Sequence, residues 1–320
     1  MTANPVTPLD LQTAEDLAAQ DMPPIRMVVG TIIPAGLLLL AGDPKSGKSL
    51  LLMCLALSIA EGKPAWGVYP VDAGDVLYMS YEGGIRSFRQ RLLNMIGDDP
   101  APARLEVGTK SNLLGAGLEG QIEGWLLKKD APRLVVIDTY TAVAPETRGV
   151  NRLREDYATL AGLAELATQW PDTLFAVVHH TRKSDANDGD VMQKISGSQG
   201  MTAVTDGNAV LSRHTAARQC VLNIRPRNAE ESEIVLERDL DTLRWHAIGV
   251  DERSQLSASR QTILAWMDTH PGGGQPKTMA DDLDLSSNSI RQLLPQMVKD
   301  RQLTQPKRGW YSLTNETTAA

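Results

Sequence analysis

The sequence contains little of what defines several large classes of protein. Two cysteines, Cys54 and Cys220, occur in 320 residues, and neither belongs to a Cys/His cluster with the spacing of a zinc site. This excludes a disulfide scaffold and predicts two small core residues in a reducing cytoplasm. Every apolar run is broken well short of a membrane span, and the first residues lack the basic and then apolar order of a signal peptide. We therefore expect a cytoplasmic protein with no membrane partner.

An excess of positive charge is also missing, because 32 Lys and Arg stand against 39 Asp and Glu and the formal net charge is −7. This balance argues against a general basic coat for nucleic acid, although a ring or groove can be basic locally while the exterior is acidic. Hydrophobic residues make up 42% of the chain, which is enough for a sizeable core. The length suggests two domains.

The most informative positive feature is the stretch from Gly36 to Ala60, where an apolar run, a glycine-rich loop and an apolar helix follow one another. Its centre matches the phosphate-loop motif G-x-x-x-x-G-K-[ST] with Gly42, Asp43, Pro44, Lys45, Ser46, Gly47, Lys48 and Ser49. Backbone N–H groups of such a loop point at nucleotide phosphates from a helix N-terminus. Lys48 is expected to reach the β- and γ-phosphates, and the Ser49 hydroxyl to complete the coordination of Mg²⁺.

Apolar strands alternate with amphipathic helices from residue 25 onward. This predicts an α/β fold whose mainly parallel sheet is covered by helices on both faces. We expect strands at Leu37–Ala41, Val76–Ser80, Leu134–Asp138, Leu174–His179, Ala209–Arg213, Val221–Arg225 and Ser232–Arg238. We expect helices at Ser49–Ala60, Ile85–Met95, Gly117–Lys128 and Arg154–Trp170. The last strands follow one another without helices, so the sheet is expected to end in antiparallel hairpins.

The chain is expected to divide into an N-terminal arm (1–24), this α/β domain (25–250), a polar linker (251–258) and a C-terminal unit (259–320). The last of these has the pattern of a winged helix-turn-helix. It has expected helices at Arg260–Thr269, Thr278–Leu283 and Ser287–Asp300, and two short strands around Arg308 and Gly309. Five basic residues lie from Arg291 onward, whereas the middle helix is acidic at its end. Duplex DNA and a protein partner are both compatible with this unit.

Polar residues at the ends of other expected strands complement the phosphate loop. Asp138 ends an apolar strand, where its carboxylate can hold Mg²⁺ through water beside Ser49. Glu82 follows another strand and is placed to orient or deprotonate an attacking water. His179 and His180 end a third strand, and only one of two successive residues can face the site. We favour His180 as a sensor of the γ-phosphate, with a packed or capping histidine as the alternative.

These motifs together resemble a known family. The sequence has no N-K-x-D motif for reading guanine, so ATP is the expected nucleotide. The phosphate loop, Glu82, Asp138, the His-His strand end, the Gly/Ser-rich segment from Ser196 to Leu211 and a late Arg-x-Arg-Asn element look like the RecA-like core of ring helicases. The resemblance is to plasmid RepA-type hexameric replicative helicases, with DnaB-type helicases more distant. It implies an α/β RecA-like fold and a homo-oligomer, expected to be a hexamer.

The late basic pair is given a role by the same resemblance. In that family it reaches across the subunit boundary to the neighbour's ATP, and Arg225 and Arg227 match its position. A pair of arginines at the sheet edge is the alternative. DnaB-type proteins carry Lys at the position of Arg225 and Gln at the position of His180, which leaves the division of labour between Arg225 and Arg227 open.

Two long segments, Thr139–Arg152 and Thr181–Gly200, correspond to the loops with which RecA-like rings contact DNA in the central channel. The basic residues expected to bind phosphates of single-stranded DNA are Arg148, Arg152, Arg182, Lys183 and Lys194. Apart from Tyr140, neither segment contains an aromatic residue that could stack on bases, so binding is expected to tolerate any sequence.

The leading functional hypothesis is an ATP-hydrolysing, ring-forming DNA helicase or translocase of a plasmid, phage or mobile-element replication system. A RecA-like recombination or single-strand annealing ATPase is the first alternative. A nucleotide-switched regulator that binds duplex DNA through its winged helix is the second.

Overall fold

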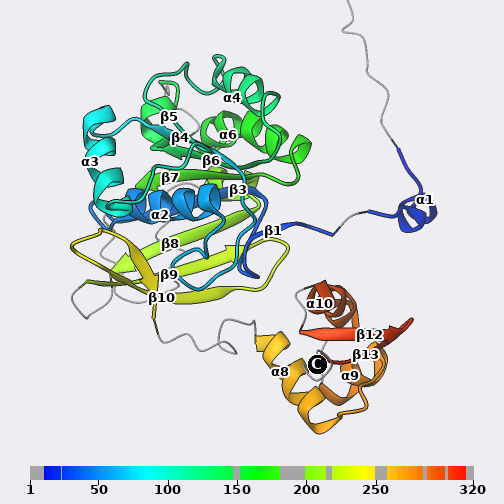
Figure 1. The fold of residues 1–320 in the computed structure, drawn as a ribbon. Coiled ribbons are helices and arrows are strands. Elements are labelled where there is room, and N and C mark those ends of the chain that lie inside the picture. The colour runs from blue at the N-terminus through cyan, green and yellow to red at the C-terminus, as the bar shows by residue number, and fades with distance from the viewer. Residues whose placement is uncertain are drawn as a thin grey trace, which may run out of the picture.

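A computed structural model describes residues 11–22, 24–146, 152–180, 199–213, 218–248, 258–283, 287–299 and 302–314. At its centre is a nine-stranded sheet (Figure 1). In spatial order the strands are β11 (Trp245–Ala247), β10 (Ser232–Arg238), β9 (Gln219–Pro226), β8 (Gly207–Arg213), β3 (Gly36–Gly42), β7 (Leu174–His180), β6 (Pro132–Asp138), β4 (Asp75–Ser80) and β5 (Leu105–Gly108).

The strands from β8 to β5 are parallel neighbours, whereas β9, β10 and β11 join through antiparallel pairs. Both the mainly parallel sheet and its antiparallel end are confirmed. The sequence did not predict β5 and β11. Each is a short strand at an outer edge of the sheet, where a half-exposed burial pattern leaves only a weak apolar signal.

Helices cover both faces of this sheet (Figure 1). One core packs α2 (Lys48–Glu61) and α3 (Gly84–Ile96) on the face that carries Leu38 and Leu40. The other packs α4 (Leu118–Leu126), α5 (Tyr140–Val143), α6 (Arg152–Gln169) and α7 (Gln199–Val204) on the face of Leu37 and Leu39. Successive strand residues point to opposite faces, so one apolar run serves both cores. Cys54 and Cys220 are buried in the first core, as expected.

Smaller elements complete the domain. A hairpin of β1 (Met27–Val29) and β2 (Ile33–Pro34) packs into the first core. Before it, α1 (Ala14–Ala19) is a short helix with no buried residue, and Thr13 Oγ1 accepts a hydrogen bond from the N–H of Asp16 at its start. Within the described part of the chain, no helix is long and apolar enough to cross a membrane.

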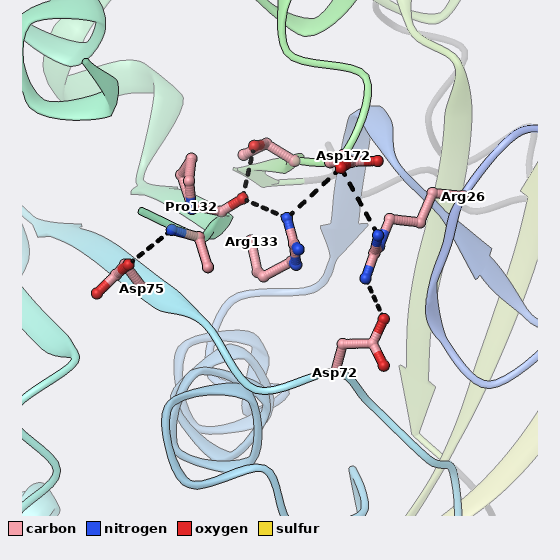
Figure 2. A network of polar contacts seen from close by, with 8 residues as sticks. Arg26, Asp72, Asp75, Pro132, Arg133 and Asp172 are labelled. Atoms are coloured by element: carbon pink, nitrogen blue, oxygen red, sulfur yellow. Dashed lines mark hydrogen bonds and ion pairs between the residues drawn. The ribbon is translucent and has the colours of Figure 1, made fainter. Parts of the chain in front are cut away.

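A network of polar contacts lies at the end of the sheet where β4 and β6 begin (Figure 2). Arg26 forms ion pairs with Asp72 and, at 3.6 Å, with Asp172. Arg133 approaches Asp172 to 3.8 Å, and Asp75 Oδ2 accepts a hydrogen bond from the N–H of Ala131 at 3.2 Å. The contacts link segments that are far apart in sequence, so they stabilise this end of the sheet. The phosphate loop lies at the opposite end of the strands.

The C-terminal unit contains α8 (Ala258–Thr269), α9 (Pro276–Leu283), α10 (Ser287–Lys299), β12 (Leu303–Lys307) and β13 (Trp310–Leu313). The order of three helices and an antiparallel hairpin agrees with the expected order. Its buried residues form a core of their own, which includes Ile263, Met279, Leu294 and Tyr311. The division of the chain into the four segments given above stays a prediction.

Candidate nucleotide-binding site

The site residues meet because the carboxyl ends of four parallel strands lie side by side at one end of the sheet. In the register of the sheet, Gly42 at the end of β3 lies beside His180 of β7. Ser80 at the end of β4 lies beside Asp138 of β6, and Glu82 follows two residues later. Carboxyl ends of parallel strands are where open α/β sheets bind ligands.

The phosphate loop leads directly into α2. Gly47 is the N-cap of this helix with φ of 101°, a left-handed conformation that favours glycine. A Cβ atom at this position would lie 2.7 Å from Cζ2 of Trp245, so the indole of β11 packs against the loop. Cys220 of β9 and Arg213 of β8 contact the carbonyl oxygens of Ser46 and Lys45, at 3.7 Å and 3.5 Å. The antiparallel end of the sheet therefore supports the phosphate loop.

Lys48 is buried at the start of α2, with a relative exposure of 4%. Its Nζ donates hydrogen bonds to the carbonyl oxygens of Gly42 and Asp43, at 2.8 Å and 2.9 Å. Burial lowers the pKa of this amine, while the nearby carboxylates of Asp138, Asp43 and Glu82 raise it. The ammonium group thus lies inside the curl of the loop, where it can neutralise a phosphate.

Asp138 lies beside the start of α2 and is 3% exposed. Its Oδ2 accepts a hydrogen bond of 2.8 Å from the hydroxyl of Tyr78, which also donates to the carbonyl oxygen of Ser49 at 3.2 Å. Burial raises the pKa of Asp138, while hydrogen bonds from Ser49 and Tyr78 lower it. Oδ1 is buried and has no hydrogen-bond partner in the described part of the chain. A free carboxylate oxygen beside the Ser49 hydroxyl is a donor set that fits Mg²⁺.

Sequence reasoning missed Tyr78. It lies in the middle of β4, is 1% exposed, and looks in the sequence like one more apolar core residue. A buried tyrosine hydroxyl needs a hydrogen-bond partner, and this was the available signal. Which partner it finds depends on the pairing of β4 with β6.

Glu82 and His180 lie together at the mouth of the site. His180 Nε2 is 3.2 Å from Glu82 Oε1, and Thr139 Oγ1 donates to the same oxygen at 3.3 Å. The Glu82 side chain is 52% exposed, so water can reach it. His179 points elsewhere and packs edge to face against Tyr140, with ring centroids 5.7 Å apart. His180 thus faces the site, whereas His179 packs against α5 beneath it.

Arg225 and Arg227 lie at the opposite end of the strands from the phosphate loop, near the point where β3 begins. Arg225 in β9 pairs with Asn208, and the N–H of Arg227 donates to Asp206, next to the start of β3. Arg225 Nε donates to Glu231 at 3.0 Å, and Arg227 Nη2 donates to the carbonyl oxygen of Ala203 at 2.8 Å. The length of β3 separates the pair from its own phosphate loop.

The residues expected to bind DNA are mostly outside the described part of the chain. This holds for Arg148, Arg182, Lys183 and Lys194, whereas Arg152 is the first residue of α6. The segment from Thr139 to Arg152 is not a plain loop, because it contains α5, whose Tyr140 and Val143 are buried. The second expected loop ends earlier than predicted, since α7 begins at Gln199.

Comparison with known proteins gives the family of the chain and supports its fold. A family model described as an AAA domain matches residues 2–186. Among curated proteins, none matches this sequence. A solved structure described as an ATPase domain is 12% identical with a TM-score of 0.54, over 66% of this chain and 84% of that chain. Another, described as a DnaB-like replicative helicase and its interactions with primase, is 13% identical with a TM-score of 0.53. This second alignment covers 66% of this chain and 57% of the helicase. Both similarities are similarities of fold. The expected RecA-like α/β architecture is confirmed.

Proposed function

The chain belongs to the AAA domain family, and we propose that it hydrolyses ATP. The proposed site lies at the carboxyl ends of the parallel strands. The observation that carries the proposal is the convergence of Lys48, Asp138 and Glu82 on the loop from Gly42 to Ser49. The loop presents backbone N–H groups at the start of α2, and this is the geometry that binds phosphates.

Each residue has a separate task in this proposal. Lys48 neutralises the β- and γ-phosphates, and Ser49 with Asp138 would hold the Mg²⁺ that offsets the remaining phosphate charge. Glu82 orients or deprotonates the attacking water, since its carboxylate is exposed and lies beside the loop. His180 contacts Glu82, so it is the residue through which a change at the γ-phosphate can be transmitted to β7.

The proposed biological activity is that of a ring-forming, hexameric replicative helicase or translocase acting on single-stranded DNA. The fold shared with a solved ATPase domain and with a DnaB-like replicative helicase supports it. The position of Arg225 and Arg227 far from their own phosphate loop also supports it, because arginines so placed cannot reach the nucleotide of their own subunit. Arg148, Arg152, Arg182, Lys183 and Lys194 remain the proposed contacts to single-stranded DNA, and an element of plasmid, phage or mobile origin the proposed context.

Two substitutions test the ATPase site. Lys48→Ala should abolish hydrolysis and weaken ATP binding, because it removes the charge beside the phosphates. Glu82→Gln should bind ATP normally and hydrolyse it at least a hundredfold more slowly, the usual contribution of a positioned base. Lys110→Ala and Glu123→Gln make matched changes at exposed positions and should retain the parental rate. Parental hydrolysis by Lys48→Ala and Glu82→Gln would refute the assignment.

Strand displacement separates the proposed helicase from the alternatives. The parent should release the strand of a forked duplex only with hydrolysable ATP, and Glu82→Gln should not release it. A RecA-like recombination or annealing ATPase would bind single strands and hydrolyse ATP without displacing a strand. Particle mass with ATP and single-stranded DNA, measured on the same sample, tests the ring.

A further inference from the structure

The C-terminal unit presents one helix in a way that the ATPase site does not explain. Three apolar residues, Ile290, Leu294 and Met297, bury one face of α10 in the core of the unit. The side chains of Arg291, Gln292, Pro295 and Lys299 are exposed on the other face. Between Ser287 and Lys299 there is no acidic residue, although the whole chain carries a formal net charge of −7. The exposed face of α10 is therefore basic and rich in hydrogen-bond donors.

This helix is held firmly by buried polar contacts. Arg260 of α8 is 2% exposed, and its two terminal nitrogens donate to Gln296 of α10 and to Gln302 beside β12, each at 3.2 Å. The guanidinium group thus connects α8, α10 and the hairpin through a planar set of donors. Such contacts fix the direction in which α10 presents its outer face.

The hairpin of β12 and β13 adds positive charge next to this helix. Lys307 and Arg308 are exposed at its turn, which Gly309 closes with φ of 74°. The hairpin is anchored to the turn before α9, because Trp310 Nε1 donates to the carbonyl oxygen of Gly272 at 2.9 Å. Tyr311 and Gly274 also exchange backbone hydrogen bonds. Lys307 Nζ lies 4.8 Å from the centre of the Trp310 ring, so this cation and Arg308 are carried by an anchored hairpin.

The acidic residues that the structure describes in this unit lie on other elements. Asp268 belongs to α8, and Asp281 and Asp282 belong to the last turn of α9. Asp282 has an intramolecular role, since its Oδ2 accepts a hydrogen bond of 3.0 Å from Trp266 Nε1. Among the described residues, α10 and the hairpin thus carry cations and no acidic side chain, whereas α8 and α9 carry the acidic side chains together with Arg260 and Lys277.

We propose that the C-terminal unit binds duplex DNA, with α10 in the major groove and the hairpin on an adjacent stretch of phosphates. Two helices, α9 and α10, separated by three residues of sequence follow the order of a helix-turn-helix, in which the second helix enters the groove. A helix about 20 Å long with an unobstructed polar face fits a groove about 12 Å wide. Arg291 and Gln292 have the side-chain types that read guanine and adenine edges, while Lys299, Lys307 and Arg308 can contact phosphates. This is a second DNA site, for duplex, and it goes beyond the proposed action on single strands.

The test measures binding of the full-length protein to DNA without nucleotide. Fluorescence anisotropy would report affinity for a mixed-sequence 30-base-pair duplex and for a 30-residue oligo(dT) over a series of salt concentrations. The double variant Arg291→Ala, Lys299→Ala should bind the duplex about tenfold more weakly and with a salt slope shallower by about one to two, because contacts that release counterions are lost. Its affinity for oligo(dT) should stay within about twofold of the parent.

A charge-matched control separates this effect from a change in net charge. Lys110→Ala combined with Lys128→Ala removes two exposed cations of the α/β domain and should retain the parental duplex affinity. Equal duplex affinity and equal salt slopes for the two double variants would overturn the proposal and leave the face of α10 to a protein partner. Equal losses on duplex and oligo(dT) would also overturn it. Because no nucleotide is present, failure of the ATPase or helicase proposal would not affect this result.

Discussion

At the scale of single residues, Tyr78 links the two halves of the proposed Mg²⁺ site. Its hydroxyl donates both to Asp138 Oδ2 and to the carbonyl oxygen of Ser49, so it holds the end of β6 against the start of α2. Its ring packs edge to face on Phe88 of α3, with centroids 5.1 Å apart, which fixes the position of the hydroxyl. We regard Tyr78 as a positioning residue for Asp138.

Tyr78→Phe should therefore raise the Mg²⁺ concentration required for half-maximal ATP hydrolysis, by about tenfold if one hydrogen bond to a charged group is lost. The effect should grow as the pH falls. Burial raises the pKa of Asp138 and the Tyr78 hydrogen bond lowers it, so its loss lets protons compete with Mg²⁺ at a higher pH. Steady-state rates at several Mg²⁺ concentrations and pH values measure this.

Tyr69→Phe is a control, because this tyrosine is buried in the same core without contact to Asp138. It should leave the Mg²⁺ requirement and its pH dependence as in the parent. If Tyr78→Phe does the same, Asp138 does not depend on Tyr78 for its position.

At the scale of elements, the phosphate loop depends on a strand that is far away in sequence. The indole of Trp245 in β11 is 3% exposed and occupies the space next to Gly47. The backbone N–H of Trp245 also donates to Cys54 Sγ of α2 at 3.4 Å. Burial raises the pKa of this thiol to about 11, so it stays protonated and packs as a small core residue. β11 therefore braces both the loop and the helix that follows it.

Gly47→Ala should abolish ATP binding for two separable reasons. The added Cβ meets the Trp245 ring at 2.7 Å, and φ of 101° is strained for alanine. Adding Trp245→Leu should relieve the clash and restore part of the binding. Gly115→Ala is the matched control, because its φ of 68° carries strain while nothing lies within 4 Å of the new Cβ. Isothermal titration with ATP measures all three, and no recovery in the double variant would contradict the bracing role of β11.

At the scale of the whole molecule, the two ends of the sheet have different proposed tasks. Phosphate contacts gather at the end where β3 stops, and Arg225 and Arg227 lie at the end where β3 starts. From Leu37, beside Asp206, to Gly42, the strand spans about 16 Å. An arginine at one end can complete a nucleotide site only if another subunit brings its own phosphate loop to it.

Arg227→Ala should leave ATP binding near the parental affinity and lower turnover about a thousandfold, because the guanidinium is proposed to act on the neighbour's nucleotide. Mixing Arg227→Ala with Lys48→Ala subunits should recover hydrolysis, since some boundaries then pair an intact loop with an intact arginine. Arg104→Ala removes an exposed arginine elsewhere and should keep full turnover. Mixed assemblies that exchange subunits yet stay inactive would contradict an arginine acting between subunits.

Features that depend on neighbouring residues could be predicted from the sequence. The phosphate loop between an apolar strand and an apolar helix is a local motif, and strand ends at Glu82, Asp138 and His180 follow from local alternation. A parallel sheet then requires those ends to share one edge, so most of the candidate site could be predicted before any coordinates.

Contacts between distant elements, in contrast, follow from the three-dimensional fold. The contact of Tyr78 with Asp138 requires β4 and β6 to be neighbours, and the contact of Trp245 with Gly47 requires β11 to fold back over α2. His180 was favoured for the site from the sequence, but the partner of His179, the ring of Tyr140 in α5, belongs to a helix that the sequence did not predict. The physical reason is that strand order and side-chain contacts come from burial across the whole chain, which no local pattern records.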